Sequence, residues 1–249
     1  MKKERIDKIL FEKGITESVT KAQALVMSGV VLVNEQRIEK PSEIFSLTAK
    51  IRIKNDSAQN KYVGRGGLKL EKALKAFHIR PSEFVCLDIG ASTGGFTDCL
   101  LQNGAKKVYA IDVGTNQLVW KLRNNARVEV RENVNARYLK PEDFNEKFDL
   151  IVIDVSFISV TKILPALILL LKDDGKIITL IKPQFEVRKG EVSKGGVVYD
   201  EEKHKRVIEE ISQAAEVVGL QVLDVIDSPI LGAEGNKEFL ALYEKSTRN

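Results

Sequence analysis

The feature that most constrains the fold is an alternation of strand-like and helical segments between residues 84 and 243. Short runs rich in valine, isoleucine and leucine predict strands, and several of the segments between them show helical spacing of apolar residues. This alternation is typical of a parallel sheet that is covered on both faces by helices. We predict strands at 84–89, 108–113, 128–131, 150–155, 177–181, 221–226 and 238–243, and helices at 116–124, 160–171 and 202–218.

The last two predicted strands are joined only by the Gly-rich stretch SPILGAEGN, with no helix between them. A seven-stranded sheet whose final pair forms an antiparallel hairpin is a specific variant of the doubly wound α/β fold. We therefore predict a Rossmann-like α/β domain. The apolar run ILPALILLL falls short of the ~20 residues that span a bilayer, so we expect a buried helix there.

The first 55 residues show a different pattern. Apolar residues at helical spacing predict two short helices, which Gly14 and Gly29 end, and the runs VVLVN and KIRIK predict small strands. We predict a small α+β domain at 1–55, a linker at 56–63 and the second domain at 64–249. Residues 1–75 carry a net charge of +7 and the remainder −3, which allows a nucleic-acid partner for the first domain, although a charge run is usually a solvated face.

Other classes are disfavoured. The start MKKERIDKIL has basic residues but no apolar core or cleavage site of a signal peptide, so we expect a cytoplasmic protein without a membrane partner. Cys86 and Cys99 lack metal-ligand spacing and the two histidines are far apart, so we expect buried thiols and no metal site. The sequence does not indicate an oligomeric state.

The stretch CLDIGASTGGF, at 86–96, marks the first turn between strand and helix in the sheet. In doubly wound folds, ligands bind beside this turn, beyond the carboxyl ends of the strands. Glycine permits positive φ and a close approach, and the following helix offers free N–H groups to an anion. The spacing departs from the dinucleotide pattern G-x-G-x-x-G. We predict ligand contacts from Gly90, Ser92, Gly94, Gly95 and Phe96.

Asp112 ends the second predicted strand, 22 residues after Gly90, where its carboxylate can accept both hydroxyls of a ribose. Together with the glycine turn and the terminal hairpin, it indicates S-adenosylmethionine rather than NAD, because the carboxylate of S-adenosylmethionine is a smaller anion than pyrophosphate. We also expect the cofactor to contact Val113. Asn135 is the candidate for reading the adenine edge, although an asparagine there could simply be a turn residue.

Four polar residues are candidates for the chemistry. Asp154 and Lys182 end the fourth and fifth strands, so both face the same crevice, and Asp154 is also a candidate cofactor contact. Lys69 opens the helix before the first strand, and Glu238 opens the last strand. Taken singly, Lys69 and Glu238 look like ordinary surface charges.

These motifs carry a resemblance to a known family. The most specific of them are RGGLKL, LDIGASTGGFT, DVGTNQL, DVSFIS, KPQFEV and GNKEF. Over essentially the whole chain, the sequence resembles the TlyA family of ribosomal-RNA methyltransferases, sometimes labelled hemolysins. That family joins an RNA-binding module like that of small-subunit ribosomal protein four to an FtsJ-like 2′-O-methyltransferase domain. The resemblance implies S-adenosylmethionine as cofactor, a cytidine of 16S or 23S rRNA as target, and a tetrad at Lys69, Asp154, Lys182 and Glu238.

The resemblance also implies that the first domain holds structured rRNA, free or in a ribosomal subunit. Independently of it, Arg5, Lys8 and Lys21 fall on the two predicted helices, where they could follow a phosphate backbone, and Arg65 could add a contact after the linker. Such contacts position RNA without reading its sequence. The glycine-rich basic segment 186–199 is predicted either to order over RNA as a lid or to be a plain flexible loop.

A ribose 2′-hydroxyl is a poor acid, so its methylation needs a base and close alignment. We expect Lys182 to be that base. Burial and the nearby Lys69 cation would favour its neutral amine, whereas the Asp154 and Glu238 carboxylates would favour the ammonium, and the sequence leaves the balance open.

Three rival functions remain from the sequence. A methyltransferase acting on an RNA base amine is the closest, because DVSF stands where such enzymes carry an Asp/Asn-Pro-Pro-aromatic motif; both prolines are absent. A membrane-lytic hemolysin is disfavoured by the lack of a spanning or secretory segment. An RNA-binding assembly factor without activity is disfavoured because the tetrad and the glycine turn are intact.

Overall fold

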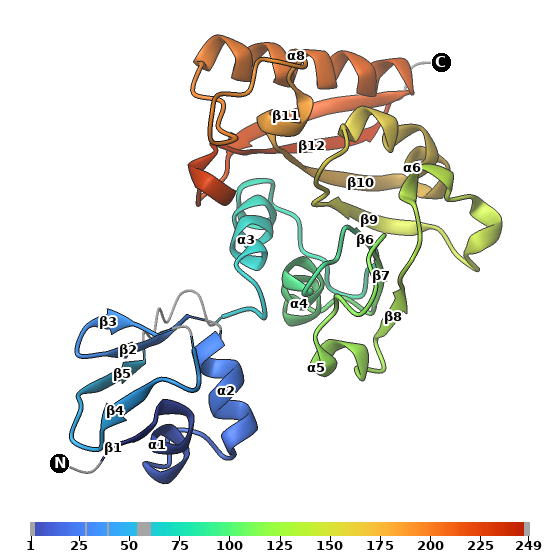
Figure 1. Ribbon diagram of the computed structural model, residues 1–249. Helices are drawn as coiled ribbons and strands as arrows, with labels where there is room; N and C mark the ends of the chain where they lie inside the picture. Colours follow the sequence, from blue (N-terminus) through green and yellow to red (C-terminus); the bar gives the residue numbers. More distant parts are fainter. Residues whose placement is uncertain (1–2, 28, 39, 54–60, 247–249) are drawn as a thin grey trace. The chain divides into compact units, whose positions relative to one another are not determined.

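The computed structural model describes residues 3–27, 29–38, 40–53 and 61–246 (Figure 1). The chain divides into two compact units, 1–60 and 61–249. Of the predicted linker, residues 56–60 lie outside the described residues. Its last part packs with the second unit, because Tyr62 is buried there among apolar side chains that include Leu70 and Cys99.

The N-terminal unit packs two helices against small antiparallel sheets. Helices α1 (Ile6–Glu12) and α2 (Val19–Met27) bury Ile6, Leu10 and Val26 together with residues of the strands. One sheet has the order β3-β2-β5, and β1 pairs with β4 in a second. The strands are β1 (Lys3–Arg5), β2 (Val31–Val33), β3 (Gln36–Arg37), β4 (Ile44–Ser46) and β5 (Ile51–Ile53).

The prediction that Arg5 lies on a helix is wrong. Arg5 ends β1, where it pairs with Ile44, and α1 begins one residue later. Strands β1 and β4 were not predicted, because KER and IFS, unlike the runs VVLVN and KIRIK, do not lie in a longer run with the pattern of a strand. Lys8 and Lys21 lie on α1 and α2, as predicted.

A buried carboxylate holds the beginning of α1. Asp7 receives two hydrogen bonds from the Arg5 guanidinium, at 3.1 and 2.6 Å, and a third from the Gln23 side chain at 2.9 Å. These bonds, above all those of Arg5, lower the pKa of Asp7 to about 2 despite its burial. Asp7 therefore ties α1 to α2 through Gln23 and fixes the orientation of Arg5.

The second unit contains a seven-stranded sheet with the order β11-β12-β10-β9-β6-β7-β8. Strand β12 runs antiparallel to both of its neighbours, β10 and β11, whereas the other described pairs are parallel. The predicted sheet and its terminal hairpin are thus confirmed. The strands are β6 (Val85–Ile89), β7 (Lys107–Ile111), β8 (Val128–Arg131), β9 (Phe148–Ile153), β10 (Leu171–Ile181), β11 (Leu220–Asp227) and β12 (Phe239–Lys245).

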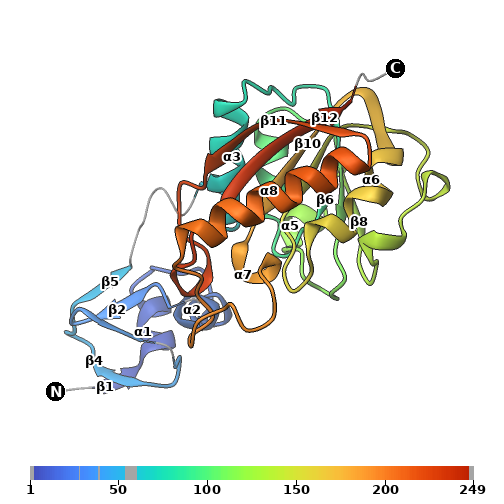
Figure 2. The ribbon, with the colours of Figure 1, turned by 90° about the horizontal axis from the view of Figure 1, so that it is seen from above.

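Helices cover both faces of this sheet (Figure 2). Leu70, Leu100 and Leu122 bury one face from α3 (Gly66–Ala76), α4 (Gly95–Gln102) and α5 (Trp120–Arg123). Residues of α6 (Leu164–Leu170) and α8 (Glu201–Val217) bury the other face. A short helix, α7 (Pro183–Glu186), follows β10. The 3₁₀ helices are η1 (Ala136–Tyr138), η2 (Pro141–Asp143), η3 (Val160–Lys162) and η4 (Ala233–Gly235).

Two predicted helices are shorter than expected. Only Trp120–Arg123 of the segment 116–124 is helical, because the residues before it form a loop whose backbone N–H groups bond to Glu132. The segment 160–171 divides into η3 and α6, and Leu171 already opens β10. No helix among the described residues has the length and apolar character needed to cross a membrane.

The topology leaves a crevice at one edge of the sheet. From β6 the chain proceeds outward through β7 and β8, and it then returns to place β9 on the other side of β6. The connections that leave the carboxyl ends of β6 and β9 therefore diverge, which is where doubly wound folds bind their ligands.

We expect Asp7→Asn to lower the free energy of unfolding of the N-terminal unit by about 2 kcal/mol at pH 7, because the fold stabilises the ionised carboxylate. This advantage of the wild type is present above pH 4 and is lost as the pH falls toward 2. Native-state hydrogen exchange of the α1 amides measures it. Glu17→Gln, at an exposed ion pair with Lys21, is the control. A difference between Asp7→Asn and wild type that does not change with pH would contradict this account.

Candidate active site

The glycines after β6 make room for the protein's own chain. Gly90 has a φ of 82°, and a Cβ there would clash with the backbone carbonyl oxygen of Asp154. Gly94 has a φ of 102°, and a Cβ would clash with the side chains of Leu118 and Leu122. At Gly95 it would lie 3.0 Å from the backbone nitrogen of Gly67, where α3 packs on α4. Glycine is thus required here by internal packing.

A first cavity of about 520 Å³ opens beside this turn. Its lining includes the apolar residues Ile158 and Ile163 and the predicted contacts Gly90, Ser92, Asp112, Val113, Asn135 and Asp154. This mixture of apolar walls and a few fixed polar groups is typical of a site for a small organic ligand.

Asp112 is held rigidly at the rim of the first cavity. One oxygen of its carboxylate accepts a hydrogen bond from the Ser92 backbone N–H at 2.8 Å, and the other accepts one from the Gly114 N–H at 2.7 Å. Each oxygen keeps a further lone pair, so the carboxylate can accept two hydroxyl groups in addition. The neighbouring Val113 is 73% exposed and offers an apolar surface to the same cavity.

Asn135 combines both roles that the sequence allowed. Its side-chain oxygen accepts hydrogen bonds at 3.2 Å from the backbone N–H and the Nε of Arg137, so it caps η1 as a turn residue does. Its Nδ2 group makes no hydrogen bond with the described residues, and Asn135 lines the first cavity. A donor toward a ligand is therefore still available.

The second cavity, of about 360 Å³, contains all four residues of the predicted tetrad. Lys69 Nζ donates to Glu238 Oε2 at 2.5 Å, and both side chains are buried. Lys182 Nζ forms an ion pair with Asp154 Oδ1 at 2.5 Å and donates to Ser156 Oγ at 3.1 Å. The expectation from single residues that Lys69 is a surface lysine is wrong, because α3 buries it against Glu238.

The two cavities adjoin. Asp154, Ser156 and Phe157 line both of them, together with the glycine turn at Gly90 and Ser92. Of the other predicted contacts, Gly95, Phe96 and Arg65 line only the second cavity. Gly94 lines neither cavity, because the position that a side chain would occupy there is taken by Leu118 and Leu122. One aspartate therefore lies between a ligand cavity and a lysine-rich cavity.

The predicted RNA contacts of the N-terminal unit are each paired with an acidic neighbour. Arg5 binds Asp7, Lys8 lies 3.7 Å from Glu4, and Lys21 pairs with Glu17. These pairs reduce the local excess of positive charge.

Sequence reasoning missed Phe157. Its side chain is 91% exposed, its φ is 64°, and its ring lies against that of Phe185, with centroids 4.9 Å apart. A positive φ is a costly conformation for a bulky residue, and such conformations gather at functional sites. No pattern of the sequence indicates a backbone angle, so DVSF alone could not have shown this.

Sequence reasoning also missed Asp88, a carboxylic acid buried within the apolar strand β6. Thr97 Oγ1 donates to its Oδ2 at 2.6 Å, and its Oδ1 has no hydrogen-bond partner among the described residues. Burial raises the pKa of Asp88 to about 7, and the nearby charges of Asp154 and Asp112 act in the same direction. An acidic residue in the run VCLDI was the available signal.

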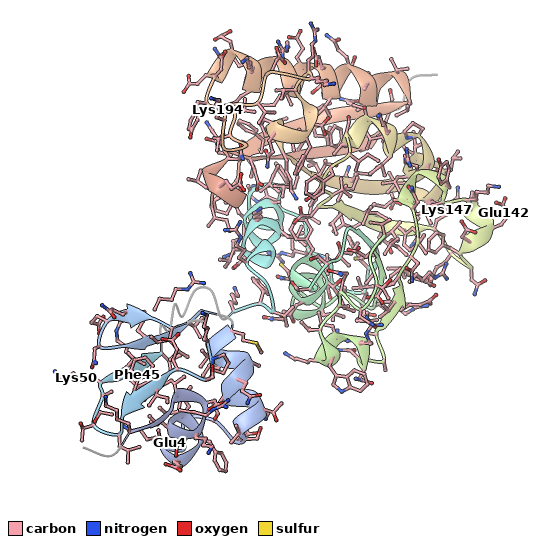
Figure 3. All side chains as sticks on the ribbon, in the orientation of Figure 1. Glu4, Phe45, Lys50, Glu142, Lys147 and Lys194 are labelled. Carbon is pink, nitrogen blue, oxygen red and sulfur yellow. The ribbon has the colours of Figure 1, made fainter. Side chains whose placement is uncertain are left out.

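The segment predicted to be a lid is anchored at its end. Val197 and Val198 are buried, and the Asn236 side chain bonds to the Val198 N–H and to the Gly196 carbonyl. Lys194 is exposed, at the outer edge of the unit (Figure 3). Residues 188–190, 192–195 and Tyr199 of the segment are exposed and therefore open to a partner.

No group of three or more His, Cys, Asp or Glu side chains in the described part of the chain could hold a metal ion. Both cysteines are buried thiols, as predicted.

The fold and the paired cavities define a Rossmann-like methyltransferase unit, which here follows a small α+β unit. A family model described as "FtsJ-like methyltransferase" matches residues 62–245, and one described as "S4 domain" matches residues 4–50.

Known proteins refine this result. "Hemolysin A" of Brachyspira hyodysenteriae is 46% identical over 96% of this chain and 99% of its own length. "16S/23S rRNA (cytidine-2'-O)-methyltransferase TlyA" of Mycobacterium tuberculosis is 42% identical over 98% of this chain and 90% of its own. A solved structure of a hemolysin-like protein from Streptococcus thermophilus superposes with a TM-score of 0.77 at 45% identity, covering 99% of this chain and 90% of that one. The chain therefore belongs to the TlyA family of FtsJ-like methyltransferases.

We expect the free energy of unfolding of the second unit to fall as the pH rises from about 4 to about 7, because the folded state binds the Asp88 proton more tightly than the unfolded state does. Asp88→Asn has no proton to lose there, so its stability relative to wild type should grow across this window. Urea unfolding at several pH values measures the difference, with the exposed Asp174→Asn as control. Parallel curves for Asp88→Asn and wild type would disprove the assignment.

Proposed function

We propose that this protein transfers a methyl group from S-adenosylmethionine to the 2′-hydroxyl of a cytidine in ribosomal RNA, of the small subunit, the large subunit or both. The observation that carries the proposal is the pair of lysine–carboxylate contacts, Lys69–Glu238 and Lys182–Asp154, which line one cavity beside the cavity of Asp112. The relative from M. tuberculosis is named for this reaction on both rRNAs.

The first cavity fits the cofactor. The fixed Asp112 carboxylate would accept the ribose hydroxyls, Asn135 would donate to the adenine, and Val113 and Ile158 would cover its faces. When bound, S-adenosylmethionine supplies the activated methyl group. Asp154, which borders both cavities, would mark the side on which the acceptor enters.

The second cavity fits the acceptor. Lys182 is the proposed base, whose Nζ atom, as the neutral amine, takes the proton of the 2′-hydroxyl and becomes the ammonium. Asp154 and Ser156 both lie within reach of that atom and would hold it in place. The buried Lys69–Glu238 pair would orient the ribose through the lysine Nζ. Such alignment supplies much of the rate of a transfer between two bound groups.

The RNA would be held outside these cavities. Phe157, exposed at the shared wall, offers a ring on which an unstacked base can lie, and Arg65 offers a cation for a phosphate. We propose that residues 1–55 form the RNA-holding domain, through Arg5, Lys8 and Lys21, and that residues 64–249 form the catalytic domain. The substrate implies that the enzyme works where ribosomes are made.

The rival reaction, on a base amine, finds less support. That chemistry has no role for the Lys182 amine, which here pairs with Asp154, and both prolines of its motif are absent from DVSF. The two reactions differ in where the methyl group is found. We expect digestion of rRNA treated with this enzyme to give 2′-O-methylcytidine as the labelled nucleoside, and a methyl group on the base would refute the proposal.

We expect Lys182→Met to reduce the rate of methyl transfer at saturating RNA at least about 100-fold, because removal of a general base typically costs that much. Cofactor binding should persist, since Lys182 does not line the first cavity. Transfer of tritiated methyl groups to rRNA and isothermal calorimetry measure the two effects. Lys147→Met, at an exposed lysine just before β9 and so at the opposite end of that strand from Asp154 (Figure 3), is the matched control. Near-normal transfer by Lys182→Met would rule out this base.

A further inference from the structure

Two segments that follow neighbouring strands are joined by three successive contacts. Segment 154–160 follows β9, and segment 182–186 follows β10. Lys182 contacts Asp154 and Ser156, the ring of Phe185 lies against that of Phe157, and Glu186 bonds to Val160. The contacts occur in the same order along both segments, so each reinforces the next.

The third contact is a hydrogen bond that the proposed reaction does not use. Glu186 Oε1 accepts from the Val160 backbone N–H at 2.9 Å, across 26 residues of the chain. Val160 is buried and begins η3, whose first N–H groups need acceptors from outside the helix. Burial raises the pKa of Glu186, whereas its hydrogen bonds with Ser159 and Val160 and the charge of Lys162 oppose that rise.

The segment between these contacts forms the wall that both cavities share. Asp154, Ser156 and Phe157 line both cavities, and Ile158 lines the first. Phe157 keeps its positive φ only while the residues on both sides of it are held. The Lys182 contacts hold the chain before Phe157, and the Glu186 contact holds it afterwards.

We propose that Glu186 is a positioning residue that anchors segment 154–160, so that one wall serves the cofactor and the acceptor nucleotide together. The proposal rests on the proposed function for the identity of the two ligands. A carboxylate suits the role because it accepts the Val160 N–H with a charge-assisted bond and stays inside the fold. Without it, the Val160 N–H loses its acceptor, and we expect the wall to be held less firmly on the side after Phe157.

Hydrogen exchange tests the anchor directly. We expect the amides of 155–160 to exchange at least about tenfold faster in Glu186→Ala than in wild type, because the Val160 N–H loses its acceptor. Glu186→Gln keeps an oxygen at the same reach and should restore most of the protection. Glu186→Asp is a milder variant whose shorter side chain cannot reach Val160, so it replaces the alanine variant if that one does not fold.

The matched control is Glu191→Ala. Glu191 follows segment 182–186 in the chain, but its carboxylate pairs with Arg206 on α8, and Glu191 lines neither cavity. We expect this variant to leave the exchange of 155–160 unchanged.

Binding measurements then test the positioning role. In Glu186→Ala we expect the dissociation constant for S-adenosylmethionine and the KM for rRNA each to rise about tenfold, with partial rescue in Glu186→Gln. Unchanged exchange of 155–160 would overturn the inference. Faster exchange with both constants unchanged would show that the anchor does not position the site. If the wild type binds cofactor but methylates no RNA, the proposed function fails, whereas exchange and cofactor binding still decide the role of Glu186.

Discussion

The site depends on one close approach between two strands of the sheet. The backbone of Gly90, just after β6, lies so near the carbonyl oxygen of Asp154 that a side chain could not fit between them. Next to this contact, the Asp154 N–H donates to the Ile89 carbonyl at 2.9 Å. The ends of β6 and β9 are thereby fixed to each other, and Asp154 is placed where both cavities meet. A bulkier residue at 90 would separate the strand ends and, with them, the two ligand sites.

Buried charge is the second constraint. Removing a lysine and a glutamate from water is costly, and an ion pair in the interior often repays only part of that cost. The second unit nevertheless buries Lys69 and Glu238 against each other, and Gly232 leaves the space that the Glu238 carboxylate needs. A well-packed pair of apolar side chains would have stabilised the fold at least as much as this ion pair does. We infer that the pair is retained for what it does to a bound ribose.

Much of this arrangement could be predicted from the sequence. Aliphatic runs such as VCLDI and FDLIVI are buried strands because a parallel sheet covers both of their faces, so their pattern reveals them. The polar residues that end these runs, Asp112, Asp154 and Lys182, meet at one edge because parallel strands share a direction. The assignment of Lys69 and Glu238 needed more, since only family motifs connected two residues 169 positions apart.

What could not be predicted depends on contacts between distant segments. The glycine turn suggested room for a ligand, but Gly94 makes room for Leu118 and Leu122 of the loop and helix that follow β7. Strands β1 and β4 pair with each other, and neither KER nor IFS lies in a run with the pattern of a strand. The conformation of Phe157 and the hydrogen bond from Val160 to Glu186 likewise arise from the packing of two loops. The residue types in these loops do not indicate how the loops pack.

The most direct measurement is a crystal structure of this protein with S-adenosylhomocysteine, the product that the cofactor leaves behind. We predict that the ribose hydroxyls of S-adenosylhomocysteine bind the Asp112 carboxylate and that its sulfur points toward the cavity of Lys182 and Asp154. Binding elsewhere on the molecule, or a sulfur directed away from these two residues, would contradict the claim that the shared wall brings donor and acceptor together.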